Sequence, residues 1–277
     1  MKIKKHALVL FSKYPEPGVT KTRLMEENGG SLTAREAADF YKAMVLDTAA
    51  VGCHALKACR GNGVDASFDF VVSTSPATQL PGIRAMFEEA LPGEEVHYMV
   101  DRGENFDEHF NDCYQQLFKK GYDSVVCIGG DMPAMTPDLV ERAFKWLVNL
   151  EKDSTAGAMV LAPCQAGGVS LVGVTQTANM DFRGVFYNTG GVSALDALIH
   201  IARQKNIPTA LFEALSDVDL MEDLAHMITV VNAMAYAAKF QPDLLVPERT
   251  LAFIRQVGLI ANTPPNTAHD PRNAIDD

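Results

Sequence analysis

The chain has 277 residues, 47% hydrophobic content and a formal net charge of -11, which indicate a globular protein large enough for a sizeable α/β domain. The acidic balance argues against a nucleic-acid partner, because such a partner requires a basic face. Five cysteines without a C-x-x-C pair indicate neither a disulfide framework nor a zinc ribbon. No apolar run reaches membrane-spanning length, and the first is too short for a signal peptide, so we expect a cytoplasmic protein.

The first predicted strand, residues 6–11, leads directly into a positively charged loop. Its apolar run is typical of a central parallel strand, and the prolines and glycine of residues 12–23 predict a shaped loop rather than a helix. Lys13, Lys21 and Arg23 place three cations where an anionic ligand such as a diphosphate could bind. Ordinary solvated surface charge is the alternative explanation.

Helices and strands then alternate. A capping box at Thr33–Glu36 begins a helix, strands are expected at 68–73 and 96–99, and further helices at 83–90 and 106–118. This alternation predicts an α/β fold with an open, mainly parallel sheet flanked by helices on both faces. Core packing is the expected role of the aromatic side chains of the last helix, Phe106 among them.

A second apolar run, residues 124–128, ends in Gly129, Gly130 and Asp131. It predicts a buried strand with Asp131 at its carboxyl end, the edge where ligands bind in open α/β sheets. The glycines leave room for a ligand or a second loop, and the carboxylate could bind a divalent cation. A structural aspartate that closes a tight turn is the alternative. Residues 136–137 begin a further helix.

Glycine-rich turns dominate the next segment. Two short strands, 158–163 and 170–174, flank Gly167 and Gly168, and predict a hairpin or strand break that admits close approach of a ligand. Another turn follows at 185–191, before a helix that begins at Ser193 and a strand at 209–212.

Acidic residues follow the last predicted strand. Asp219 and Glu222 fit a helix cap, which is a sufficient structural explanation for Asp219. Asp217 has no such explanation, and because alternate residues of an extended segment point the same way, Asp217 and Asp219 could share a cation. The candidates for a general base are Glu104, Asp101 and Asp107, all near the end of the third predicted strand.

The sequence divides near residue 240. Residues 241–277 contain a predicted helix at 247–257 and a tail rich in Pro, Asn and Asp that begins at Asn262 and that we expect to be poorly ordered. Nothing in the sequence fixes the oligomeric state.

Four motifs in a fixed order resemble one family. They are residues 11–24 (FSKYPEPGVTKTRL), 129–137 (GGDMPAMTP), the Gly167-Gly168 pair, and 217–224 (DVDLMEDL). Over approximately residues 3 to 240 the chain resembles the bacterial proteins called domain of unknown function 2064. These look like GT-A-fold nucleotide-diphospho-sugar transferases and are similar to phospholactate guanylyltransferases. The resemblance therefore implies a GT-A-like domain over residues 1–240.

The resemblance also implies roles for individual residues. Asp131 and Asp219 would hold Mg2+ or Mn2+, and Asp131, Lys21 and Arg23 would be catalytic, because they neutralise charge on the departing diphosphate. The implied nucleotide-binding residues are Ser12, Lys13, Gly18, Lys21, Arg23, Gly129 and Gly130, and those on the acceptor or sugar side are Glu104, Gly167, Gly168, Asn188, Thr189 and Asp217.

The sequence departs from the family pattern on the acceptor side. Relatives commonly have E-D-G-G-Y where this chain has Q-A-G-G-V at residues 165–169, and Ala166 can bind neither a metal nor a sugar hydroxyl. Tyr187-Asn-Thr189 stands where the family often has Trp-Ser-Thr. Because the phosphate loop is intact, the sequence predicts retained nucleotide binding with an altered or lost transfer step.

Three functions follow as hypotheses. The first is a metal-dependent transferase that takes a nucleotide-diphospho-sugar donor and a small-molecule acceptor. The second is nucleotidyl transfer from a nucleoside triphosphate to a phosphorylated acceptor, with release of pyrophosphate. The third is a nucleotide-binding protein that has lost catalysis, which Ala166 suggests.

Overall fold

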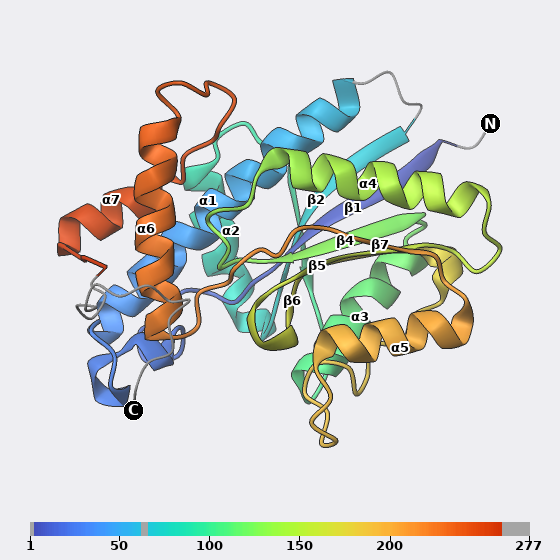
Figure 1. The fold of residues 1–277 in the computed structure, drawn as a ribbon, viewed down its shortest axis with the longest axis horizontal. Helices are drawn as coiled ribbons and strands as arrows, with labels where there is room; N and C mark the ends of the chain where they lie inside the picture. The colour runs from blue at the N-terminus through green and yellow to red at the C-terminus, as the bar shows by residue number, and fades with distance from the viewer. Residues whose placement is uncertain (1–2, 62–65, 262–277) are drawn as a thin grey trace, which may run out of the picture.

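The structure, a computed structural model, describes residues 3–61 and 66–261. At its centre is a seven-stranded sheet of order β3-β2-β1-β4-β6-β5-β7 (Figure 1). Within the described residues, β6 alone runs against the other strands, since it pairs antiparallel with β4 and β5 while all other pairs are parallel. The predicted mainly parallel sheet is therefore confirmed. The strands are β1 (Lys4–Phe11), β2 (Ala66–Thr74), β3 (Val96–Val100), β4 (Ser124–Gly129), β5 (Met159–Pro163), β6 (Val169–Thr175) and β7 (Thr209–Leu211).

Helices cover both faces of the sheet, as predicted. Because successive side chains of a strand point to opposite faces, Leu8 and Leu10 of β1 enter one hydrophobic cluster and Ala7 and Val9 enter the other. Figure 1 shows α1 and α4 over one face and α3 and α5 over the other. The first cluster also contains residues of α2. These helices are α1 (Ala34–Gly61), α2 (Leu80–Ala90), α3 (Phe106–Lys119), α4 (Pro137–Lys152) and α5 (Ala194–Lys205).

Local capping explains where α1 and α3 begin. The amide of Glu36 donates to Oγ1 of Thr33 at 3.2 Å, and the Thr33 amide donates back to the Glu36 carboxylate at 2.8 Å. This is the predicted capping box. At α3, the side chain of Asn105 accepts from the amide of Glu108 at 3.0 Å.

The carboxyl-terminal helices α6 (Met221–Ala237) and α7 (Glu248–Val257) pack beside α1. Phe253 of α7 meets Phe40 of α1 with ring centroids 5.3 Å apart. The buried carboxylate of Asp47 on α1 accepts from the amides of Arg249 and Thr250 at 3.3 and 2.8 Å.

The structure places α7 at Glu248–Val257, which confirms the helix predicted at 247–257. The division at residue 240 stays a prediction. The predicted tail from Asn262 lies outside the described residues. In the part of the chain that the structure describes, no helix is both long and apolar enough to cross a membrane.

The start of α6 differs from the prediction. The carboxylate of Asp223 accepts from the amides of Asp219 and Leu220 at 3.1 and 2.8 Å. The predicted cap of Asp219 with Glu222 is therefore wrong, because the helix begins at Met221 and its third residue is Asp223. The side chain of Asp219 is consequently available for another role.

Candidate active site

The carboxyl ends of β1 and β4 bring the first loop and Asp131 together. Phe11 pairs with Gly129, so the segments that begin at Ser12 and Gly130 leave the sheet as neighbours. A Cβ atom at Gly130 would lie 2.7 Å from Cγ2 of Val45, which means that only glycine lets α1 pack this closely against the turn.

Tyr41 of α1 holds the start of the loop. Its hydroxyl lies 3.1 Å from Oγ of Ser12 and accepts from the amide of Lys13 at 3.3 Å. Sequence reasoning missed Tyr41, and the available signal is a hydroxyl on an apolar helix face, because a buried tyrosine hydroxyl usually has a hydrogen-bond partner.

Lys21 lies at the centre of the site. Its Nζ donates to Oδ2 of Asp131 at 2.6 Å and to Oδ1 of Asp219 at 2.7 Å, and its side chain is only 7% exposed. Burial alone would lower the pKa of Lys21, but the two carboxylates raise it above its ordinary value. The structure therefore joins one buried ammonium to the two acids implied as metal ligands.

The backbone of the loop is shaped to deliver this ammonium. Gly18 lies in the turn that precedes Lys21, and Lys21 itself has φ 51°. This left-handed conformation is uncommon for a residue with a Cβ atom, and such strain occurs often at functional sites.

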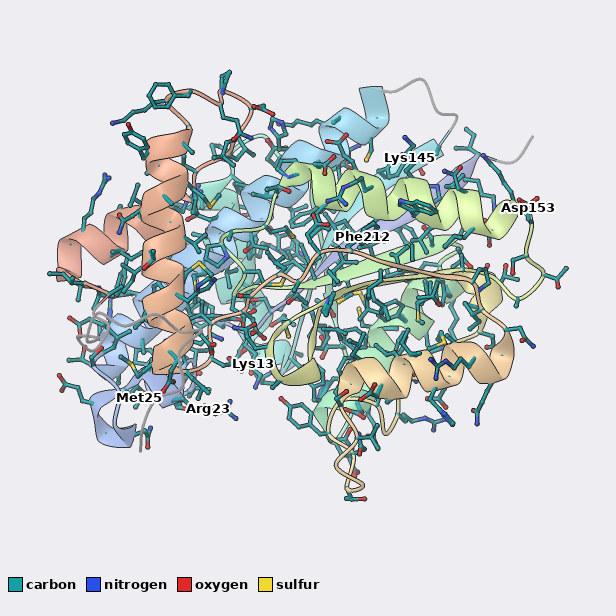
Figure 2. All side chains as sticks on the ribbon, in the orientation of Figure 1. Lys13, Arg23, Met25, Lys145, Asp153 and Phe212 are labelled. Carbon is teal, nitrogen blue, oxygen red and sulfur yellow. The ribbon has the colours of Figure 1, made fainter. Side chains whose placement is uncertain are left out.

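Arg23 and Lys13 are the other cations of the loop. A guanidinium nitrogen of Arg23 lies 3.6 Å from Oδ2 of Asp219, while the Arg23 side chain is 65% exposed. Figure 2 shows Lys13 and Arg23 on the side of the molecule away from Asp153 at the end of α4. Both side chains are exposed, so an anion can reach them although Arg23 also contacts Asp219, whereas the ammonium of Lys21 is buried between two acids.

Asp217 adds a third carboxyl group to this region. Burial, followed by the negative charges of Asp131 and Asp219, raises the pKa of Asp217 to about 6. For Asp219, the opposing effect of burial is exceeded by the charges of Lys21 and Arg23, which lower its pKa. Asp217 thus lies within electrostatic reach of Lys21 and of the two acids that contact its ammonium.

Gln165 connects this acidic group to the hairpin between β5 and β6. Its Nε2 donates to the carbonyl of Asp217 at 3.0 Å and to Oδ1 of Asp223 at 2.9 Å, and its Oε1 accepts from the Asp217 amide at 3.3 Å. The thiol of Cys164 also donates to Oδ2 of Asp217 at 3.6 Å. Sequence reasoning missed Gln165, since no local pattern indicates its distant partners.

The hairpin glycines lie against other parts of the protein. A Cβ atom at Gly167 would lie 2.6 Å from Cβ of Ser193, and one at Gly168 would lie 2.5 Å from Sγ of Cys164. The close approach predicted at these glycines is therefore made by Ser193 and Cys164. The contact with Ser193 also places the hairpin beside the turn that precedes α5.

That turn is held by two polar side chains. The buried carboxylate of Asp107 accepts from the amides of Phe186 and Tyr187, each at 3.2 Å. The Asn188 side chain donates to the carbonyls of Val185 and Val192 and accepts from the Val192 amide. Asn188 thus closes the turn itself.

The three candidate general bases lie in different surroundings. Asp101 is buried, accepts from Oγ of Ser73 at 2.7 Å and lies 2.7 Å from Nδ1 of His109. Asp107 binds the turn described above, and Glu104 is exposed. Among the described residues, neither Glu104 nor Thr189 forms a hydrogen bond or ion pair with Lys21, Asp131 or Asp219.

The acids at Lys21 fit a divalent cation only with help from a ligand. No group of three or more His, Cys, Asp or Glu side chains within residues 3–61 and 66–261 is arranged to hold a metal ion. Asp131 and Asp219 nevertheless aim carboxylate oxygens at one point, which the Lys21 ammonium occupies. Mg2+ commonly binds one or two carboxylates together with substrate phosphates and water, so this pair is compatible with such an ion.

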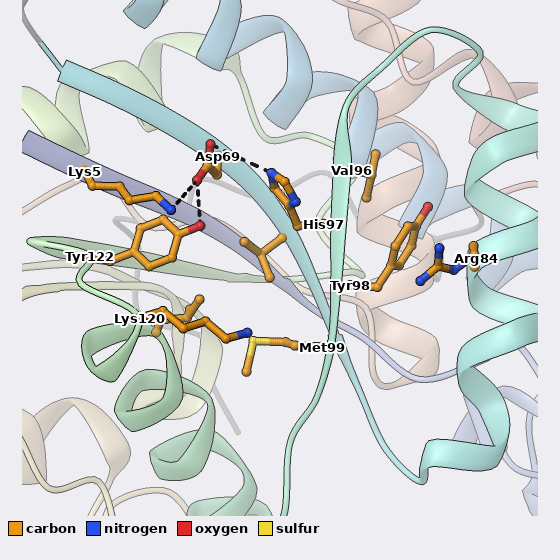
Figure 3. Close-up of a pocket in the computed structure, with 11 residues that line it drawn as sticks. Lys5, Asp69, Arg84, Val96, His97, Tyr98, Met99, Lys120 and Tyr122 are labelled. Atoms are coloured by element: carbon orange, nitrogen blue, oxygen red, sulfur yellow. Dashed lines mark hydrogen bonds and ion pairs between the residues drawn. The ribbon is translucent and has the colours of Figure 1, made fainter.

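A separate pocket of about 420 Å3 lies at the edge strand β3 and contains none of the predicted site residues (Figure 3). Its central acid is Asp69, which accepts from the Tyr122 hydroxyl at 2.6 Å and pairs with Lys5 at 3.3 Å and His97 at 3.9 Å. These mutual contacts account for Asp69 structurally.

Comparisons with known proteins agree with this architecture. The fold is that of GT-A-like nucleotide-diphospho-sugar transferases and nucleotidyltransferases. Residues 71–189 match the family described as uncharacterized proteins conserved in bacteria, DUF2064, which confirms the family resemblance over that stretch. The matched stretch contains Asp131, whereas Lys21 and Asp219 lie outside it.

Two solved structures illustrate the likeness. A proposed nucleotide-diphospho-sugar transferase from Desulfovibrio desulfuricans G20 is 22% identical, with a TM-score of 0.70, and the match covers 92% of this chain and 96% of that one. A cytidylyltransferase from Leptospira borgpetersenii serovar Hardjo-bovis is 10% identical, with a TM-score of 0.50, covering 96% and 100% of the two chains. No curated protein matches the sequence. At these identities the likeness is one of fold.

Proposed function

We propose that this protein is a metal-dependent transferase that binds a nucleotide-diphospho-sugar and transfers the sugar to a small-molecule acceptor. The observation that carries the proposal is the buried ammonium of Lys21, which lies between Asp131 and Asp219 at the carboxyl edge of the sheet. The likeness in fold to the proposed nucleotide-diphospho-sugar transferase supports it.

The acids at this edge would bind the metal ion of a metal–diphosphate complex, and the cations would bind its phosphates. Asp131 and Asp219 would hold Mg2+ or Mn2+, and the exposed cations Lys13 and Arg23 would bind phosphate oxygens. The bound metal would supply charge neutralisation for the departing diphosphate. Lys21 would exchange its carboxylate partners for phosphate, because an ammonium and a metal ion compete for the same oxygens. Ser12, Gly18, Gly129 and Gly130 would shape the backbone around the phosphates.

The acceptor side would be formed by the segments that Gln165 and Ser193 bring together. Gly167 and Gly168 belong to the hairpin, and Asn188 and Thr189 belong to the adjoining turn. Glu104 would be the general base, since it is the exposed acid among the three candidates while Asp101 and Asp107 already have internal partners. Asp217 would contribute negative charge beside the metal ligands.

Nucleotidyl transfer is the second candidate, and the likeness in fold to a cytidylyltransferase favours it. In that reaction a phosphorylated acceptor attacks the α-phosphate of a nucleoside triphosphate, and Lys21 and Arg23 stabilise the pyrophosphate that leaves. Product analysis separates the two reactions, because glycosyl transfer releases a nucleoside diphosphate and nucleotidyl transfer releases pyrophosphate.

The first test is a thermal-shift measurement with nucleoside di- and triphosphates and nucleotide sugars, with and without Mg2+ or Mn2+. A ligand at about a hundred times its dissociation constant adds roughly 2.7 kcal/mol of stability, a shift of several degrees for a protein of this size. We expect this shift in wild type only with metal, and we expect it to be absent in Asp131→Ala.

The matched control is Asp181→Ala, which removes an exposed aspartate paired with Arg183 and should respond as wild type does. A wild-type protein that no nucleotide stabilises would contradict both transferase proposals. Binding without turnover against any acceptor would instead support a protein that has lost catalysis, the alternative suggested by Ala166.

A further inference from the structure

A series of contacts connects the turn before α5 to the loop that carries Lys21. The Tyr187 ring meets Phe106, and Phe106 meets Phe11, the last residue of β1. The next residue, Ser12, lies 3.1 Å from the Tyr41 hydroxyl, and Nζ of Lys21 lies 5.8 Å from the centre of the Tyr41 ring. The turn that carries Tyr187 and the loop that carries Lys21 therefore both lie at the carboxyl end of β1.

Tyr187 and Phe106 form the aromatic part of this series. Their ring centroids are 5.4 Å apart with an interplanar angle of 75°, and Phe106 in turn meets Phe11 at 5.5 Å. Tyr187 is 77% exposed and Phe106 is 37% exposed. The prediction that Phe106 belongs wholly to the core is therefore incomplete, because part of its ring faces outward beside an open tyrosine.

The backbone of Tyr187 is fixed although its ring is exposed. Asp107, only 5% exposed, accepts from the amides of Phe186 and Tyr187. A buried carboxylate is costly unless hydrogen bonds compensate it, and here both compensating amides belong to the segment that presents the ring. Phe186 is packed against Phe106 and Phe110, so the turn has a buried anchor as well.

A fixed backbone with an exposed aromatic ring is the arrangement expected of a binding surface. Aromatic side chains give a large contact area, and a turn that is ordered before binding loses little entropy when a ligand arrives. Tyr236, 63% exposed on α6, offers a matched control, because its ring meets Phe240 at 5.6 Å and Nζ of Lys239 at 5.0 Å.

We propose that Tyr187 and Phe106 form a platform on which a flat ring of the bound ligand stacks. The ring would be either the nucleobase or the pyranose of a nucleotide sugar, since both present an apolar face. This proposal rests on the proposed function, which places the diphosphate of the same ligand at the other side of the site, at Lys21 and Arg23.

The experiment uses the ribonucleoside diphosphates ADP, CDP, GDP and UDP, and the sugars UDP-glucose, GDP-mannose and ADP-glucose, each with Mn2+. Wild-type affinities come from calorimetry, and the tightest pair of diphosphate and sugar is then measured on Tyr187→Ala and Tyr187→Phe. We expect binding to weaken at least fivefold in Tyr187→Ala and to be retained in Tyr187→Phe. Tyr236→Ala is the matched control and should bind as wild type does.

The two ring sources give different patterns. A loss that is equal for the diphosphate and its sugar assigns the platform to the base, while a loss confined to the nucleotide sugar assigns it to the pyranose. A direct readout is available because Trp146 is the only tryptophan. In the double variant Trp146→Phe and Tyr187→Trp, the same ligand should quench the new indole.

Two outcomes overturn the proposal and are distinguishable. If wild type binds a ligand, Tyr187→Ala binds it equally and the ligand does not quench the indole fluorescence of the double variant, the platform is refuted and the proposed function stands. If wild type binds none of the probes, the proposed function fails and the platform fails with it. Circular dichroism of each variant checks that the fold is intact.

Discussion

Removal of the Lys21 ammonium should destabilise the protein in a way that a divalent cation reverses. In Lys21→Met the side chain keeps its apolar length, but Asp131 and Asp219 lose a partner at 2.6 and 2.7 Å. At an effective dielectric constant of about 20, each contact corresponds to roughly 6 kcal/mol of attraction, most of which is offset by the desolvation of the ammonium.

Loss of one partner from a fully buried ion pair costs about 3–5 kcal/mol. Asp131 and Asp219 are partly exposed, so water can solvate them again and we expect a loss of about 2–3 kcal/mol. This corresponds to a decrease in Tm of roughly 5–10 °C, measured by differential scanning fluorimetry in a chelating buffer. Lys145→Met, at an exposed site on α4, is the control and should change Tm little.

Mn2+ should then stabilise Lys21→Met more than wild type, because the ion no longer competes with the ammonium for the two carboxylates. At a hundred times its dissociation constant the ion would restore about 2.7 kcal/mol. If Lys21→Met unfolds at the wild-type temperature and Mn2+ does not raise its Tm, the ammonium does not occupy a cation site and the charge argument is wrong.

Three further variants examine the surroundings of this cluster. Asp217→Asn should be more stable than wild type above pH 6 in metal-free buffer. The pKa of the wild-type carboxyl group is raised from 3.8 to about 6, so the contribution of this group to stability is complete below about pH 4 and is lost as pH rises through 6. The rise in pKa corresponds to at most about 3 kcal/mol, which partial exposure reduces to about 1–2 kcal/mol. The difference in free energy of unfolding between the variant and wild type, measured with urea, should therefore change between pH 4 and pH 7.5, and the same difference at both pH values would refute the sign. Gly129→Ala should fold but bind Mn2+ and nucleotide more weakly, because its Cβ atom would lie 2.9 Å from Oδ1 of Asp131, and unchanged calorimetric affinity would show that the carboxylate position is unimportant. Gln165→Ala should lower stability by about 1 kcal/mol through release of the hairpin from Asp217 and Asp223, and an unchanged urea midpoint would show that these hydrogen bonds contribute nothing net.

The convergence of Lys21 and Asp131 shows what the sequence could predict. They are 110 residues apart, yet each follows an apolar run that ends in turn residues, and parallel strands end at one edge of the sheet. The strand-end argument therefore brought the correct loops together without knowledge of the strand order. It could not show that the ammonium would lie between two acids, because this depends on where α6 begins.

Asp219 and Tyr187 show why the remainder could not be predicted. For Asp219, the prediction placed the helix cap one residue too early, at Asp219 with Glu222 rather than at Leu220 with Asp223. This one-residue difference decides whether the Asp219 side chain is free, and helix boundaries are the least certain part of a periodicity argument. For Tyr187, the backbone amide is held by Asp107, 80 residues earlier in the chain, so no local pattern predicts the turn that presents the ring.

The attachment of α7 to α1 has a consequence for synthesis of the protein. Asp47 finds its amide partners at Arg249 and Thr250, about 200 residues later. At about 5–20 residues per second, a ribosome needs roughly 10–40 s to bridge that interval. Throughout it, the helix that carries Tyr41 lacks its last neighbour. The nascent chain therefore completes this side of the candidate site late, after every strand of the described sheet has been synthesised.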